Sequence, residues 1–305
     1  MPENIPSKPR LTLGPVLFNW RPEKLRDFYF RIADEADVDT VCVGEVVCSK
    51  RSPFIAPHLP EILDRLAASG KEVVLSTLAL VMSKREMDQI AELSGADGWL
   101  VEANDVSAAA LAAGRPFAVG PLVNVYNEGT LAHLERLGAV RVCLPAELSA
   151  AAIATLAGGA AAEIEVQAFG RLPLAISARC YAARARNLAK DSCQYVCADD
   201  PDGMVVDTLD DEPFLAVNGT QTMSYHYVSL LAELDALRAG GVRRFRLWPQ
   251  DVDMVGVAGL FRETLAGAVD PAAAAARLGA LCPGADFANG YVHGREGHAM
   301  VEADG

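Results

Sequence analysis

The sequence predicts a (β/α)8 barrel, a closed ring of parallel strands surrounded by helices, with one long insertion between the seventh and eighth strands. Three observations predict this fold. Short β-rich runs alternate with helical patterns, there are eight such runs, and a long interval from residue 170 to residue 243 breaks their rhythm. Strand and helix in alternation are typical of parallel sheets, either closed into a barrel or open and doubly wound.

The strand candidates are short apolar runs rich in Val and Leu. Runs such as VVLST (73–77) and FAVGPL (117–122) show no alternation of polar and apolar residues. This is expected of parallel strands that are buried on both faces. Eight strands close this type of barrel. The candidates span residues 11–18, 40–46, 72–77, 98–102, 117–122, 141–144, 163–169 and 244–248.

The segments between these runs have the spacing of amphipathic helices. The first, over residues 22–36, begins with Pro-Glu and places Leu25, Phe28 and Ile32 at helical intervals. No G-x-G-x-x-G follows the first strand, which counts against a dinucleotide-binding open sheet. Further helices are predicted over residues 60–69, 84–93, 105–113, 129–137, 146–156 and 253–267.

The long interval reads as an insertion on the barrel. Residues 204–209 and 214–223 form β-rich runs separated by an acidic turn, which indicates a β-hairpin. A helix over residues 227–239, ending at two glycines, then returns the chain to the barrel. We therefore predict that residues 1–305 form a single barrel domain, with residues 171–240 as an inserted segment.

Three of the seven cysteines, Cys180, Cys193 and Cys197, lie in this insertion. Thiolates are soft ligands that suit zinc or iron–sulfur chemistry. The intervals of twelve and then three residues match neither a zinc ribbon nor the bacterial ferredoxin pattern, so the spacing leaves the metal open. Cys48 follows the second strand, and functional residues of such barrels lie in the loops after the strands. We therefore expect four thiolates to converge at the mouth of the barrel.

The other cysteines have different settings. Cys42 and Cys143 lie within strands and are expected to be small buried hydrophobic residues, whereas Cys282 precedes a proline near the C-terminus and stays unassigned. Basic residues flank the four proposed ligands. Such cations lower thiolate pKa values and offset the charge of a thiolate-bound metal, but they could equally form a solvated surface paired with carboxylates. They are Lys50, Arg51, Arg179, Arg184, Arg186 and Lys190.

Composition excludes some classes of partner. The chain has 27 Lys and Arg against 40 Asp and Glu, a net charge of −13, which disfavours nucleic acids and anionic membranes. The N-terminal MPENIPSKPR contains no apolar leader, and no uncharged run is long enough to span a bilayer. We expect a cytoplasmic protein, and in a reducing compartment cysteines serve more often as ligands than as disulfides.

Three motifs carry a resemblance to a known family. VGEVVCSKR (43–51), ISARCYAARARNLAKDSCQYVCADDPDG (176–203) and FANGYVHGREG (287–297) together resemble the collagenase-like U-type peptidase superfamily, in particular its members in ubiquinone biosynthesis. The resemblance extends along essentially the whole chain. It implies that Cys48, Cys180, Cys193 and Cys197 ligate a [4Fe–4S] cluster. It also implies a heterodimer with UbiU, a second cluster-bearing member, which supports oxygen-independent ring hydroxylation alongside the lipid-binding accessory protein UbiT.

Two alternatives remain open, a zinc-binding structural scaffold and a U-type peptidase. The sequence contains neither H-E-x-x-H nor G-x-S-x-G, and no feature pairs Cys193 with an activating base. Glu45 and Glu102 end strands at the catalytic face of the predicted barrel. For Glu45 we favour an ion pair with Lys50 or Arg51, and we assign neither carboxylate a catalytic role. The catalytic residues are left unknown.

Overall fold

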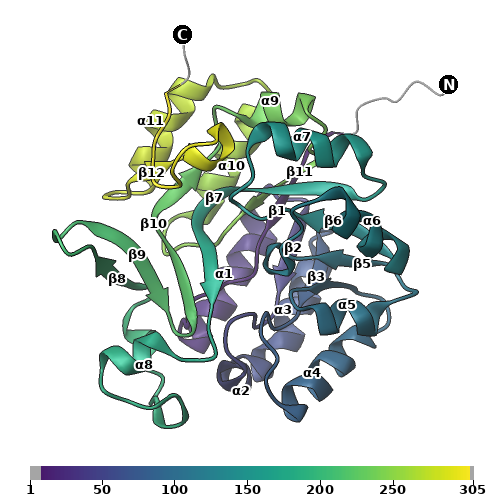
Figure 1. The fold of residues 1–305 in the computed structure, drawn as a ribbon, viewed down its shortest axis with the longest axis vertical. Coiled ribbons are helices and arrows are strands. Elements are labelled where there is room, and N and C mark those ends of the chain that lie inside the picture. The colour runs from purple at the N-terminus through teal and green to yellow at the C-terminus, as the bar shows by residue number, and fades with distance from the viewer. Residues whose placement is uncertain (1–7, 303–305) are drawn as a thin grey trace.

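The computed structural model describes residues 8–302, and its strand order confirms the predicted barrel (Figure 1). Eight parallel strands follow one another around the ring, and β11 pairs with both β1 and β7, which closes it. In ring order the strands are β1 (Arg10–Leu13), β2 (Thr40–Val43), β3 (Glu72–Ser76), β4 (Leu100–Ala103), β5 (Phe117–Val119), β6 (Ala139–Cys143), β7 (Glu163–Ile176) and β11 (Arg244–Leu247).

Helices cover the outside of the ring. Five of them begin at a side chain that accepts a hydrogen bond from the first turn, a Ser before α4 and α7, an Asp before α5 and α11 and an Asn before α6. The helices are α1 (Pro22–Glu35), α3 (Leu59–Ala68), α4 (Lys84–Ser94), α5 (Val106–Ala112), α6 (Glu128–Leu137), α7 (Ala150–Gly159), α9 (Leu234–Ala239), α10 (Met254–Leu265) and α11 (Pro271–Leu281). The sequence analysis missed α11, because its alanine-rich stretch carries little apolar periodicity.

The inserted segment differs in detail from the expectation. The predicted strand over residues 214–223 is two strands, β9 (Pro213–Asn218) and β10 (Gln221–Ser229), separated by a turn at Gly219 with φ +65°. β8 (Met204–Asp207) pairs with β9, and β10 pairs antiparallel with the long β7. Because β10 extends to residue 229, the helix predicted from residue 227 begins only at Leu234. Residues 177–243 thus connect β7 to β11, while the proposed domain boundaries stay a prediction.

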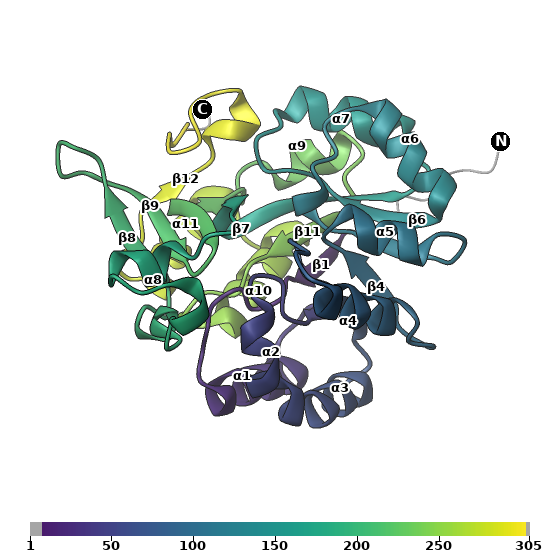
Figure 2. The same ribbon diagram turned by 60° about the horizontal axis from the view of Figure 1, so that its bottom comes forward.

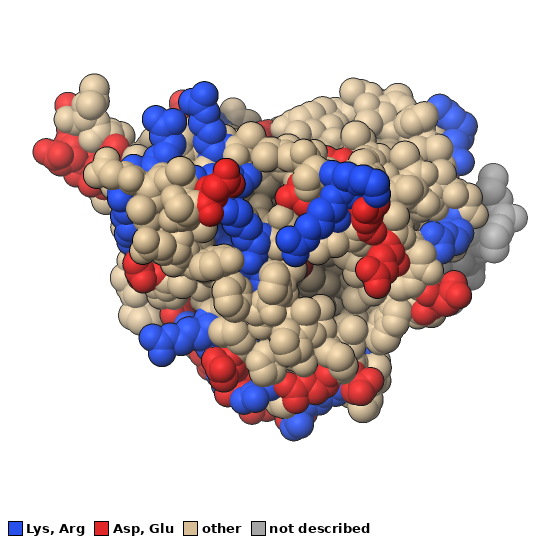
Figure 3. Space-filling model, turned by 90° about the horizontal axis from the view of Figure 1, so that it is seen from below, with Lys and Arg blue, Asp and Glu red and all other residues tan. Residues whose placement is uncertain are grey.

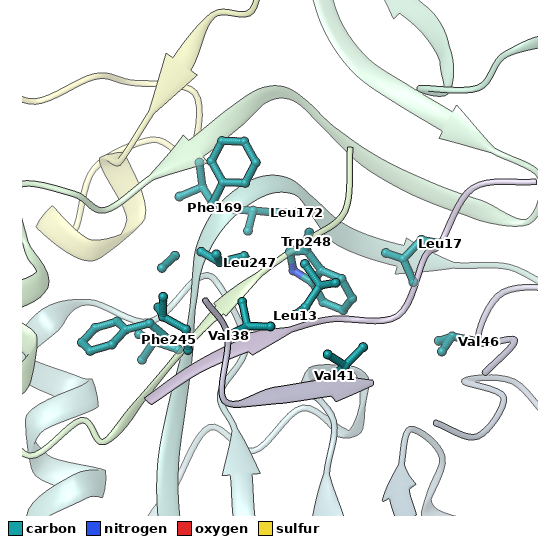
Figure 4. Close-up of a cluster of buried hydrophobic side chains, with 14 of the residues drawn as sticks. Leu13, Leu17, Val38, Val41, Val46, Phe169, Leu172, Phe245, Leu247 and Trp248 are labelled. Atoms are coloured by element: carbon teal, nitrogen blue, oxygen red, sulfur yellow. The ribbon is translucent and has the colours of Figure 1, made fainter. Parts of the chain in front are cut away.

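A buried apolar core lies where β1, β2, β7 and β11 meet the surrounding helices (Figure 4). Trp248 at the end of β11 is 1% exposed, and its Nε1 donates to Gln167 Oε1 at 2.9 Å. A Cβ at Gly14 would lie 2.7 Å from the Trp248 ring, so the indole needs glycine there. The following Pro15 has no backbone N–H, which helps to explain why β1 ends at Leu13 rather than near residue 18.

The interior of the barrel also holds buried charges. Arg246 pairs with Glu102 and, at 3.2 Å, with Glu165, and all three side chains are at most 1% exposed. Cys42 and Cys143 lie near this pair, are 1% and 0% exposed, and burial raises the pKa of both thiols well above the ordinary value. Their expected burial is confirmed. A second group of ion pairs joins Arg141 and Arg244 to Glu72 and Glu163.

Within residues 8–302, no helix has both the length and the apolar character to cross a membrane. Residues 1–7, which make up most of the segment where no leader was predicted, lie outside the described residues.

Candidate thiolate site

The loop after β2 carries Cys48 in a fixed backbone conformation. At Gly44 the chain passes so close to β3 that a Cβ would lie 2.2 Å from the Ser76 carbonyl oxygen. Beyond this turn, Glu45 Oε1 accepts hydrogen bonds from the backbone N–H groups of Val47 and Cys48, each at 2.8 Å. Cys48 then precedes the short 3-10 helix η1 (Ser49–Arg51). Glycine and a carboxylate acceptor together determine where this thiol lies.

Arg51 is the buried cation of the site, with a side chain that is 2% exposed. Its guanidinium donates to Leu17 O at 2.8 Å and to Asn218 Oδ1 at 2.9 Å. Nη1 lies 3.9 Å from Glu45 Oε1, which confirms the expected ion pair between these residues, although its contact is loose. Burial opposes the charge, but Glu45, Cys197 and Cys48 together raise the pKa of Arg51. A positive charge therefore lies beside thiols from both parts of the proposed site.

The three insertion cysteines lie on short helical turns. Cys180 precedes α8 (Tyr181–Ala185), Cys193 follows η4 (Lys190–Ser192) and Cys197 lies within η5 (Val196–Asp199). All three pack in one small apolar group with Ala182, Ala183 and Val217. The Asn19 amide donates to Cys197 Sγ at 3.4 Å, so the loop after β1 also reaches this group.

Several contacts join the Cys48 loop to the insertion. Lys50 Nζ donates to Lys190 O at 2.7 Å, and Thr220 Oγ1 donates to Val47 O at 3.0 Å. The rings of Phe54, on α2 (Ser52–Ile55), and Tyr195 meet edge to face with centroids 4.8 Å apart. α2 and α8 lie at the same end of the molecule (Figures 1 and 2). The second βα loop and the insertion therefore meet on one face, as the topology predicted.

The donor atoms suit a soft metal, but the thiols are not gathered tightly. In the described range 8–302, no three His, Cys, Asp or Glu side chains are arranged so that they could hold a metal ion. The four proposed ligands are free thiols. The pKa of the Cys48 thiol is raised above its ordinary value, and burial is the largest cause. The Arg51 guanidinium lies near Cys48 and Cys197, and its buried Nε has no hydrogen-bond partner among residues 8–302. An anionic sulfur ligand would supply the acceptor that this nitrogen lacks.

The basic residues around the site divide into two groups. Arg186 pairs with Asp200 at 2.9 Å and Lys50 lies 3.6 Å from Asp191, so part of the predicted solvated surface exists. Arg51 instead lies buried among the thiols. Seen from below, Lys and Arg side chains lie along part of the rim of a hollow in the face of the molecule, with acidic side chains close to several of them (Figure 3). The expected pairing with carboxylates is therefore present for Arg186 and Lys50, whereas a role of Arg51 in offsetting the charge of a bound metal stays a prediction.

Other candidate residues have structural roles. Glu102 is buried against Arg246, Ser76 and Asn104 in the barrel interior. In the third motif, Asn289 and His293 both contact Glu233 Oε1, at 2.8 and 2.9 Å, which attaches the C-terminal segment to the chain beside α9. The sequence analysis missed Asn19, Asn218 and Thr220 as parts of the site. No local pattern identifies them, because each acts on a residue far away in the sequence.

Comparison with known proteins identifies the family of this chain. The family model for peptidase family U32 matches residues 21–301. Among solved structures, the phospho-2-dehydro-3-deoxyheptonate aldolase (DAHP synthase) of Thermotoga maritima is 11% identical, with a TM-score of 0.42, over 91% of this chain and 70% of that chain. An uncharacterized B. cereus protein is 12% identical, with a TM-score of 0.29, over 79% of this chain and 60% of that chain. The family match spans nearly all of the sequence, so the chain belongs to peptidase family U32.

Proposed function

We propose that this chain is a UbiV-type subunit that binds a [4Fe–4S] cluster through Cys48, Cys180, Cys193 and Cys197. In this proposal it pairs with UbiU, and the heterodimer supports oxygen-independent ring hydroxylation in ubiquinone biosynthesis together with UbiT. The match to peptidase family U32 supports the superfamily part of this proposal, and the three sequence motifs support the assignment to its ubiquinone-biosynthesis members. The observation that carries the proposal is that the Cys48 loop and the cysteine-bearing insertion meet around the buried Arg51.

The residues of the chain have distinct parts in this proposal. The cluster, when bound, supplies one-electron transfer to the reaction. Arg51 offers a buried positive charge near Cys48 and Cys197, which would offset the negative charge of thiolate ligands, and an Nε donor that has no partner among residues 8–302. Asn19 donates to Cys197 Sγ, and hydrogen bonds to sulfur change the reduction potential of such centres. Because no three candidate ligands in residues 8–302 are arranged to hold a metal, cluster binding requires the thiol-bearing segments to approach one another.

Single substitutions test the ligand set. Each of Cys48→Ala, Cys180→Ala, Cys193→Ala and Cys197→Ala should lower the iron content of protein purified without oxygen and reduce anaerobic ubiquinone formation. Cys42→Ala is a control with the same chemical change at a buried thiol away from the site. If Cys48→Ala kept its full iron content, the proposed meeting of loop and insertion would not form the ligand set.

Co-expression tests the proposed partner. The chain should elute as a heterodimer with UbiU rather than as a homodimer. A stable homodimer that ignores UbiU would contradict this part of the proposal. Four thiolates also suit a closed zinc site, and zinc bound without sulfide would assign the chain to a structural scaffold. Cleavage of peptides by the isolated chain, abolished by replacing one nucleophile, would instead favour a peptidase.

A further inference from the structure

The hairpin formed by β8 and β9, residues 204–218, projects from the body of the molecule (Figures 1 and 2). Its turn is closed by its own backbone, because Thr208 N donates to Glu212 O at 2.8 Å and Asp211 N donates to Thr208 O at 3.2 Å. The Thr208 hydroxyl also accepts hydrogen bonds from the backbone N–H groups of Asp210 and Glu212, at 3.3 and 3.2 Å. The hairpin is therefore a structured element that keeps its shape without help from another chain.

β8 is the edge strand of this hairpin. It pairs with β9 on one side and with no strand of residues 8–302 on the other. An edge strand presents backbone N–H and C=O groups to which a further strand can bind, and proteins often protect such an edge with lysine or proline. β8 contains neither of these residues and carries two exposed valines, Val205 and Val206. Its free edge is thus open to another strand.

More apolar side chains are exposed on the same hairpin. Phe214 on β9 is about as exposed as the two valines of β8, and Leu209 at the turn is fully exposed. Single exposed apolar side chains are common on protein surfaces. Four of them within ten residues, on an element that projects from the body, indicate a surface that contacts another molecule.

The charge of the hairpin indicates what kind of chain it contacts. Residues 191–237 contain ten Asp and Glu and no Lys or Arg. Figure 3 shows acidic side chains gathered on the projection at its left edge, where Figure 1 places this turn. Two copies paired edge to edge would bring this acidic run against itself, so a basic partner fits the edge better than a second copy. The hairpin carboxylates that are exposed and form no ion pair within residues 8–302 are those of Asp207, Asp210, Asp211 and Glu212.

We propose that the free edge of β8 binds an extended basic segment of a second protein. The segment adds a strand beside β8, its Lys or Arg side chains lie beside the hairpin carboxylates, and its apolar side chains contact the valines and Leu209. Met204, the first residue of β8, packs against the apolar group of the insertion cysteines, so the bound segment lies beside the proposed thiolate site. This inference goes beyond the proposed function and depends on neither the cluster nor UbiU.

The test uses the full chain and three fluorescein-labelled peptides, whose binding is measured by fluorescence anisotropy. KVKVKVK is basic and can form a strand, KKVPPVKK has the same charge but two prolines that interrupt a strand, and EVEVEVE is a strand-forming peptide of opposite charge. We expect KVKVKVK to bind about tenfold more tightly than either other peptide. Equal binding of KKVPPVKK would leave charge alone as the cause and overturn the inference, and equal binding of EVEVEVE would overturn it as well.

A pair of charge variants tests whether the peptide binds at the hairpin. Asp210→Asn combined with Asp211→Asn should weaken KVKVKVK by about threefold to tenfold, as expected when two exposed ion pairs are lost, and make its binding less dependent on salt. Asp64→Asn combined with Asp97→Asn removes two exposed carboxylates outside the insertion and should leave binding unchanged. Equal weakening by both variants would assign the binding to net charge and contradict the proposal.

An apolar variant tests the contact with the turn. Leu209→Ser should weaken KVKVKVK without changing the thermal stability of the chain, because this side chain is fully exposed, whereas Val106→Ser at an exposed position of α5 should not weaken it. Full binding by Leu209→Ser would place the peptide elsewhere and overturn the inference. Sedimentation of the wild-type chain tests the other occupant. A homodimer that Leu209→Ser dissociates would assign the edge to a second copy and likewise overturn it.

Discussion

Replacing Arg51 by Met tests whether this buried cation holds the site together. Met keeps much of the aliphatic length of Arg51 but removes the donors to Leu17 O and Asn218 Oδ1 and the charge 3.9 Å from Glu45. Leu17 O keeps a second donor, the Asn218 amide at 2.6 Å, so this carbonyl stays hydrogen-bonded when the Arg51 donor is removed. Asn218 Oδ1 and the buried Glu45 carboxylate lose their cation.

The expected cost follows from these contacts. A hydrogen bond to a charged group contributes about 1.5–3 kcal/mol, and breaking a buried ion pair by removing one partner costs about 3–5 kcal/mol. The Glu45 contact is longer than a hydrogen bond, and Arg51 Nε has no hydrogen-bond partner among residues 8–302 to lose, so the lower end of the second range applies. We expect Arg51→Met to lower the free energy of unfolding by about 3 kcal/mol.

Urea titration of protein kept reduced and free of metal measures this loss, with an unchanged m value as evidence that the unfolded state is the same. Lys84→Met is the control, because Lys84 pairs with Asp88 at an exposed position and should show no clear change. Adding Glu45→Gln should recover part of the loss, since the carboxylate is then no longer left unpaired. A loss below about 1 kcal/mol, or fully additive effects in the double variant, would refute the reasoning.

Three further predictions concern the barrel and its turns. Arg246→Met should lower the free energy of unfolding by about 3–5 kcal/mol, measured by urea titration, because it leaves Glu102 and Glu165 buried without their cation. Burial by itself would raise the pKa of Glu165, but the nearby charges of Arg246 and Arg141 lower this pKa below its ordinary value of 4.5. The ionised Glu165 therefore adds stability above pH 4.5, and this stability is lost as the pH falls through the folded-state pKa. In thermal melts between about pH 6 and 3, Glu165→Gln should lose less stability on acidification than the wild-type protein. Gly44→Ala should lower both stability and iron content, because its Cβ would meet Ser76 O at 2.2 Å, whereas Gly158→Ala, where nothing lies within 4 Å, should not.

The sequence predicts the barrel well because its signals are local. Apolar runs such as 73–77 and the helices between them follow from side-chain spacing within a few residues, and the long interval before β11 identifies the insertion. The charged interior is harder to predict. Glu102 and Glu165 lie in strands whose burial on both faces suggested apolar contents, and they are stabilised by Arg246 far along the chain.

The site shows the same division between local and distant causes. The position of Cys48 after a strand, and the cysteines of the insertion, can be read from the sequence. The roles of Asn218 and Thr220 cannot, because they depend on the turn between β9 and β10, which the sequence analysis read as one strand. A Gly219 turn gives only a weak local signal, and the register with β7 decides where these side chains lie.

The measurement that tests the central proposal most directly is the iron, acid-labile sulfide and zinc content of protein purified without oxygen, with its visible absorption spectrum. The account predicts about four irons and four sulfides per chain and a brown absorption band that bleaches on reduction. Zinc without sulfide, in a colourless protein, would contradict it and leave the chain as a structural metal-binding scaffold.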